Sequence, residues 1–285
     1  MSYLMEIDNL GKRYDDFELS GVSLAVEPGC VVGFIGSNGA GKTTTIKAIL
    51  GIIAADAGTV RLFGEPVTCG SAALDAIKSR IGIVLDTCAF PDTCRVCDVG
   101  AIGRAAYREW DAAQFAALCD RFNLTPKKKV SELSRGMGMK LTLAFALSHN
   151  PELLVLDEAT AGLDPIARDE VLDLLYDFMQ DETHAVLLSS HITSDLDKIA
   201  DNITFIHRGR VLLSEGRDEL IDRHGVLRCT EEQLNALDPD AVRAGRKGAF
   251  GCEALVKRDG IPENWPVEPV SVEQIMLFLT RGEEA

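Results

Sequence analysis

Apolar residues gather in short runs along the first three quarters of the chain, with segments of helical spacing between them. The runs lie in CVVGFIG, RIGIVLD, ELLVLDE and AVLLSSH, which are rich in β-branched and aliphatic residues. Their length and composition predict buried strands. Segments such as KTTTIKAILGII and MKLTLAFALSH have the spacing of helices. This alternation predicts an α/β fold with a parallel sheet that is covered on both faces.

Two regions depart from the alternation. Residues from about 90 to 132 are alanine-rich and lack a strong strand signal, so we expect a helical insertion between two strands of the sheet. With the next helix, this helical subdomain is predicted to cover about 88–150. Beyond Gly216 the pattern weakens, and prolines punctuate a tail with two short helical segments, TEEQLNAL and SVEQIMLFLTRG. We therefore predict a main domain over 1–216 and a small α+β appendage over 217–285.

A glycine-rich segment, GSNGAGKTT, follows the first of the predicted strands and opens a predicted helix. It fits the pattern G-x-x-x-x-G-K-[ST] and consists of Gly36, Ser37, Asn38, Gly39, Ala40, Gly41, Lys42, Thr43 and Thr44. Glycines let the backbone N–H groups wrap an anion, and the helix adds its positive N-terminal end. Lys42 is expected to reach the β- and γ-phosphates of a nucleotide, and Thr43 to place its hydroxyl on Mg²⁺. A chance glycine-rich turn would not need this strand and helix around it.

Acidic residues end another predicted strand. Leu153 to Leu156 lead to Asp157 and Glu158, and ligands bind at the carboxyl ends of the strands in open α/β sheets. Asp157 is expected to hold Mg²⁺, and Glu158 to act as general base on the attacking water. His191 follows the AVLLSS strand, which should end beside Asp157, so we expect His191 to contact the γ-phosphate.

The segment LSRGMGMK, Leu133 to Lys140, contains a hydroxyl, glycines and cations but no carboxylate. Ser134 is placed to cap the helix that follows. Together with the phosphate loop, the acidic strand end and His191, this segment resembles the signature motif of the ATP-binding subunits of ABC transporters. The matching motifs run in the expected order from Tyr14 to about Gly216. The resemblance implies a phosphate-loop ATPase sheet with a helical insertion, the ABC cassette, which binds ATP and Mg²⁺.

Further roles follow from the resemblance. Two subunits would pair head to tail, so that Ser134 and Gly136 contact the γ-phosphate bound by the other subunit. Tyr14 would stack on adenine, although Phe17 lies close to it in sequence. Asp164, in AGLD, would belong to the loop that links the two sites.

The sequence also departs from the family pattern. Asp86 stands where the family usually has a glutamine that binds Mg²⁺ and water. Arg135 and Met137 replace a glycine and a glutamine of the signature, and Ala159 replaces the usual proline. These departures resemble those of the bacterial drug- and antibiotic-export branch of the family. Glu158 and His191 are kept, which argues against an inactive site.

The composition of the chain limits the classes of molecule that it is expected to bind. The chain has 285 residues and a net charge of −15, which argues against binding nucleic acid through its phosphates. No run reaches the ~20 apolar residues that span a bilayer, and the N-terminus lacks the pattern of a signal peptide. We expect a cytoplasmic protein held at the membrane through a separate multi-span permease. Of the eight cysteines, Cys94 and Cys97 form a C-x-x-C pair; reduced thiols fit better than zinc, because no second pair is evident.

The function expected from these features is an ATPase that drives a permease exporting a small hydrophobic compound, antibiotic or peptide. The helical insertion, about residues 88 to 132, would dock on the permease. Two other functions stay open: a regulatory or degenerate partner in a heterodimer, and a soluble ABC ATPase acting on ribosomes or DNA. The second usually has two cassettes or a long coiled coil, and this chain has one phosphate loop and no long heptad run.

Overall fold

The structure is a computed structural model that describes residues 3–248, 251–262 and 264–282. Within these residues, six strands form the main sheet. In spatial order they are β10 (Arg210–Gly216), β9 (Asn202–His207), β3 (Val31–Ile35), β8 (Ala185–Ser190), β7 (Leu153–Asp157) and β6 (Ile81–Val84). The strands from β9 to β6 run parallel, whereas β10 is antiparallel to β9. The parallel sheet predicted from the apolar runs is confirmed.

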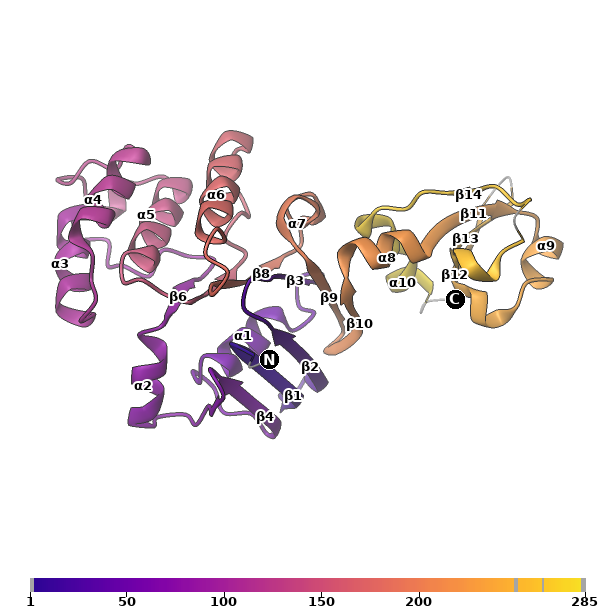
Figure 1. The fold of residues 1–285 in the computed structure, drawn as a ribbon, viewed down its shortest axis with the longest axis horizontal. Helices are drawn as coiled ribbons and strands as arrows, with labels where there is room; N and C mark the ends of the chain where they lie inside the picture. Colours follow the sequence, from indigo (N-terminus) through magenta and orange to yellow (C-terminus); the bar gives the residue numbers. More distant parts are fainter. Residues whose placement is uncertain (1–2, 249–250, 263, 283–285) are drawn as a thin grey trace.

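Helices cover both faces of this sheet. One face carries α1 (Lys42–Ile49) and α2 (Ala72–Lys78). The other carries α5 (Arg135–Leu147), α6 (Pro165–Phe178) and α7 (Thr193–Ile199), and α3 (Val96–Ala106) and α4 (Ala112–Arg121) pack on α5 in the same hydrophobic cluster. Helices α3, α4 and α5, with the short 3-10 helix η1 (Val130–Glu132), lie between β6 and β7 in the chain. This is the helical insertion that the alanine-rich segment predicts, and Figure 1 shows it at one end of the molecule.

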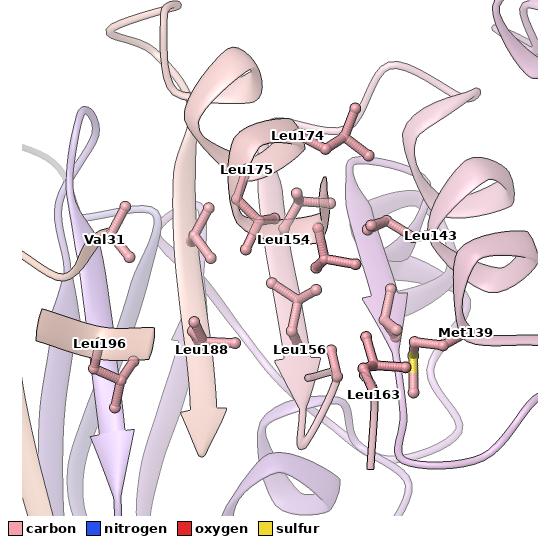
Figure 2. Packing of buried hydrophobic residues seen from close by; sticks show 14 of the residues in the cluster. Val31, Met139, Leu143, Leu154, Leu156, Leu163, Leu174, Leu175, Leu188 and Leu196 are labelled. Carbon is pink, nitrogen blue, oxygen red and sulfur yellow. The ribbon is translucent and has the colours of Figure 1, made fainter. Parts of the chain in front are cut away.

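Alternate residues of the central strands enter different hydrophobic clusters. In β7, Leu154 and Leu156 belong to the cluster beneath α5 and α6, whereas Leu153 and Val155 belong to the cluster on the opposite face. All four side chains are fully buried. Figure 2 shows Leu154 beside Leu175 of α6, and Leu156 farther along the strand toward Leu163. A strand buried on both faces needs apolar residues at successive positions, which explains why it appears as an unbroken apolar run in the sequence.

A second, antiparallel sheet packs against the α1 side of the main sheet, and the sequence pattern did not predict it. Its strands, in spatial order, are β2 (Glu18–Val26), β1 (Met5–Arg13), β4 (Ala57–Leu62) and β5 (Glu65–Pro66). Shifts in register interrupt the pairing of β1 with β2 between Ile7 and Lys12, and Asn9 has a φ of 51°. Such bulges break the alternation of apolar and polar residues that reveals a half-buried strand.

The C-terminal part forms a smaller α+β unit beyond β10 (Figure 1). It begins with α8 (Arg217–Arg223), and its described strands lie in the order β12 (Val242–Gly248), β13 (Gly251–Lys257), β11 (His224–Cys229) and β14 (Val267–Glu268). Its remaining described elements are α9 (Glu231–Asn235), α10 (Val272–Gly282) and the 3-10 helices η2 (Pro239–Ala241) and η3 (Arg258–Gly260). Ile275 and Phe278 of α10 share a hydrophobic cluster with Leu196 of α7, so this unit packs on the main domain. The domain boundary near Gly216 stays a prediction.

No helix among the described residues is both long enough and apolar enough to cross a membrane.

Candidate functional site

The glycine-rich loop closes around the side chain of Lys42. The loop connects β3 to α1, and Lys42 is the first residue of α1. The Lys42 ammonium donates a hydrogen bond to the Gly36 carbonyl oxygen at 2.6 Å and another to that of Ser37 at 3.3 Å. A Cβ at Gly36 would lie 2.5 Å from the Ile206 carbonyl oxygen, so the close approach of β9 requires glycine there. Lys42 itself is only 5% exposed.

Lys42, Glu158 and His191 come together at the carboxyl end of the sheet. The Lys42 Nζ lies 3.1 Å from Glu158 Oε1, and His191 Nδ1 lies 2.6 Å from Glu158 Oε2. Glu158 has a φ of 55°, a conformation that non-glycine residues adopt only where the surroundings hold them. Its backbone N–H donates to the Ser189 carbonyl oxygen at 3.0 Å, which anchors the turn. The structure thus brings together the three residues predicted as catalytic.

Asp157 accepts hydrogen bonds at both carboxylate oxygens. The Thr43 hydroxyl donates to Oδ2 at 2.7 Å, and the Ser189 hydroxyl donates to Oδ1 at 2.8 Å. Asp157 and Ser189 are fully buried, and they face each other across the β7–β8 pair. Thr43 and Asp157, both predicted as Mg²⁺ ligands, therefore lie in contact. Ser189 was not predicted as a site residue; the signal for it in the sequence is the pair of polar residues that ends the apolar run AVLLSS.

A cavity of about 710 Å³ opens over this group. Its lining residues come from the segment before β2, from the phosphate loop and the start of α1, from the segments after β6, β7 and β8, and from the start of α5. They are Asp16, Phe17, Ser37, Asn38, Gly39, Gly41, Lys42, Thr43, Thr44, Asp86, Arg135, Glu158, Ala161 and His191. Asp86, two residues beyond the end of β6, is exposed within this cavity. Asp86 thus lines the same cavity as Thr43 and Glu158, and its role as a Mg²⁺ ligand stays a prediction.

The aromatic residue that lines the cavity is Phe17. Tyr14 is not part of the lining and is 44% exposed, with the Lys12 ammonium 5.8 Å from the centre of its ring. Stacking of Tyr14 on adenine stays a prediction. Phe17, which is close to Tyr14 in the sequence, has the position from which a ring could cover a base in this cavity.

The signature segment and the AGLD loop lie against each other within one subunit. Ser134 caps α5, its hydroxyl accepting a hydrogen bond from the Met137 N–H at 3.3 Å, and Gly136 lies against Leu163. Asp164 caps α6 by accepting hydrogen bonds from the N–H groups of Ala167 and Ile166, which lower the pKa of its carboxyl. Ser134, Gly136 and Asp164 lie outside the cavity lining of their own subunit. Their contact with ATP across a dimer stays a prediction.

Removing the Ser189 hydroxyl should destabilise the protein and weaken its response to Mg²⁺. A Ser189→Ala variant leaves a buried oxygen of Asp157 without its partner, which costs about 1–3 kcal/mol. We expect a lower Tm and a higher Mg²⁺ concentration for half-maximal hydrolysis. Ser190→Ala is the matched control, because the Ser190 hydroxyl bonds only local backbone at Ile192. Equal behaviour of the two variants would contradict a role of Ser189 in positioning Asp157.

Known proteins share this arrangement of sequence and fold. A sequence model of the ABC transporter family matches residues 19–161. Nod factor export ATP-binding protein I of Paraburkholderia xenovorans (strain LB400) is 34% identical over 251 residues, covering 84% of this chain and 79% of that protein. Bacitracin transport ATP-binding protein BcrA of Bacillus licheniformis is 32% identical over 227 residues, covering 79% and 73%. A solved ATP-binding subunit of an ABC transporter superposes with a TM-score of 0.69 at 26% identity, covering 76% of this chain and 91% of that one.

These relatives match the chain over most of their own length, and the family model spans the phosphate loop, the signature segment and both acids of the site. The chain belongs to the ATP-binding, ATP-hydrolysing subunits of ABC transporters.

Proposed function

We propose that this chain binds ATP with Mg²⁺ in the cavity above the phosphate loop and uses its hydrolysis to drive export by a separate membrane permease. The cargo would be a small hydrophobic compound, antibiotic or peptide; the relatives are named for the export of Nod factor and the transport of bacitracin. The observation that supports the proposal best is the contact of Glu158 with both Lys42 and His191. The proposed general base, Glu158, is thus in contact with the proposed phosphate-binding cation, Lys42, and with the histidine that would orient it, His191.

The Lys42–Glu158 ion pair explains how ATP binding would prepare hydrolysis. The triphosphate carries several negative charges and Glu158 only one, so the β- and γ-phosphates would draw Lys42 away from Glu158. Glu158 Oε1 would then be available to take a proton from a water molecule. His191, 2.6 Å from the other oxygen, would keep the carboxylate oriented toward that water. Glu158 would thus be the ion-pair partner of Lys42 before ATP binds and the general base after ATP has bound.

The oxygen atoms beside the phosphate loop suit Mg²⁺. Thr43 and Asp157 present a hydroxyl and a carboxylate in contact, and Asp86 adds a second carboxylate to the same cavity. Such hard oxygen ligands are those that Mg²⁺ uses together with substrate phosphates. When bound, Mg²⁺ would neutralise the charge on the phosphate oxygens. Asp157 would be held for this purpose by Ser189 from the neighbouring strand.

The active assembly would contain two such subunits and the permease. Ser134 and Gly136 lie outside the cavity of their own subunit, which fits a contact with ATP held by a second subunit. The helical insertion would dock on the permease and place the chain at the cytoplasmic face of the membrane. Size-exclusion chromatography with light scattering tests the assembly on a Glu158→Gln variant. A dimer that forms only with MgATP would support it, whereas failure to bind ATP would contradict the proposal.

Replacing Asp86 with glutamine should raise the Mg²⁺ concentration needed for half-maximal ATP hydrolysis by several-fold. The change removes a negative oxygen ligand from the cavity while keeping a side chain that can bind the ion through its amide oxygen. A Mg²⁺ titration of the ATPase rate measures the effect. Asp92→Asn is the control, because Asp92 is an exposed acid outside the cavity lining. An unchanged titration would remove Asp86 from the metal site.

A further inference from the structure

Arg135 brings a cation into the ATP cavity from the helical insertion. It is the first residue of α5, directly after the capping Ser134, and its side chain is part of the cavity lining. The residue is exposed, and no carboxylate of the described residues lies within ion-pairing distance of it. Lys42, the other cation of the lining, is instead buried and paired with Glu158. Arg135 is therefore the cation of this cavity whose charge is available.

The Arg135 guanidinium packs against Gly162. A Cβ built on Gly162 would lie 3.0 Å from Nη1, 3.3 Å from Cζ and 3.5 Å from Nε of Arg135. The guanidinium thus covers the bare Cα of this glycine. Gly162 also has a φ of 73°, a conformation that favours glycine. A larger residue at this position would displace the guanidinium and strain the loop between Glu158 and Asp164.

The chemistry of the cavity identifies what Arg135 can bind. A guanidinium offers several N–H donors in a planar fork that matches the oxygens of a phosphate. The N-terminal end of α5 adds partial positive charge at the same place. The remaining charged residues of the lining are acids: Asp16, Asp86 and Glu158. They would repel a triphosphate unless cations in the cavity offset their negative charge. A nucleotide held by Lys42 would extend its terminal phosphate toward Glu158. Gly162, against which the Arg135 guanidinium lies, follows Glu158 by four residues in the same loop.

We propose that Arg135, held over Gly162, binds the terminal phosphate of ATP and so makes the site prefer ATP to ADP. The proposal rests on the proposed ATP site. It adds a binding residue at the position where the signature departs from the family pattern. The phosphate could belong to the nucleotide on the same phosphate loop or to the nucleotide of a second subunit, and the two sources can be separated by experiment.

The test compares ATP and ADP affinities of Glu158→Gln protein, which hydrolyses ATP slowly, with and without Arg135→Gln. We expect the additional change to weaken ATP binding about tenfold or more, since contacts to charged groups are among the stronger hydrogen bonds, and to alter ADP binding less than twofold. Arg135→Lys should restore part of the loss, because an ammonium keeps the charge without the fork. Arg104→Gln is the control, an exposed arginine of the same insertion outside the cavity lining.

Gly162→Ala should reproduce the ATP-specific loss, and its combination with Arg135→Gln should add little. If Gly162→Ala fails to fold, the Arg135 variants still decide the question. An effect on monomeric protein at low concentration identifies ATP on the same loop, whereas an effect confined to the dimer identifies ATP of the second subunit. Equal losses for ATP and ADP, or no loss, would overturn the proposal. Absence of ATP binding before Arg135 is changed would instead contradict the proposed function.

Discussion

Replacing Glu158 with glutamine should slow ATP hydrolysis by about 10²–10⁴-fold while leaving ATP binding intact. Glutamine keeps the shape of the side chain but cannot take a proton from water. The strained backbone at Glu158, the contact with His191 and the bond from its N–H to Ser189 can all persist. The loss of the ion pair with Lys42 should even favour nucleotide slightly, because Lys42 no longer has a competing carboxylate.

Phosphate release under saturating MgATP measures the rate, and titration with a fluorescent ATP analogue measures binding. Glu182→Gln provides the matched control, since Glu182 is an exposed glutamate outside the cavity and should keep the parental rate. A Glu158→Gln protein that hydrolyses ATP at the parental rate would show that another group is the base. A variant that no longer binds ATP would contradict the assignment of Glu158 to the chemical step alone.

Lys42→Ala should weaken ATP binding by about 10- to 100-fold, because each charge-assisted contact to a phosphate is worth about 1.5–3 kcal/mol. The structure adds a second consequence that the sequence pattern does not contain. Lys42 donates to the Gly36 and Ser37 carbonyl oxygens and balances the charge of the largely buried Glu158. Its removal should therefore loosen the loop and lower the Tm even without nucleotide.

The two effects can be separated by following both ATP affinity and Tm. Lys47→Ala is the matched control, because Lys47 is an exposed lysine in the last turn of the same helix. Nucleotide should raise the Tm of the Lys47 variant as it does that of the parent, and raise that of the Lys42 variant much less at equal concentration. Unchanged ATP affinity in the Lys42 variant would be incompatible with the phosphate-loop assignment.

The main sheet could be predicted because each of its strands is marked by a pattern within a few neighbouring residues. Buried parallel strands need continuous apolar runs, and each run is bounded by residues that stop it, as in Leu153 to Leu156 before Asp157. The antiparallel N-terminal sheet was not predicted, because bulges near Asn9 interrupt its alternation. Its strands also expose many residues, so that polar positions obscure the apolar face.

The sequence by itself determined which residues are predicted to carry the chemistry. The spacing of the phosphate loop and the acids at a strand end, Asp157 and Glu158, depend on neighbours within a few positions, and such patterns are visible in the chain. His191 could be placed as well, because parallel strands end at one edge of a sheet.

Only the tertiary structure decided how these residues are paired. Ser189 bonds Asp157, Lys42 pairs with Glu158, and Arg135 rests on Gly162, although the partners come from separate strands, loops and helices. Short-range periodicity records which face of an element is buried, but not which side chain of another element meets it. That meeting depends on the register of β7 with β8 and on the packing of α5 against the loop before α6, and both are set by the whole core.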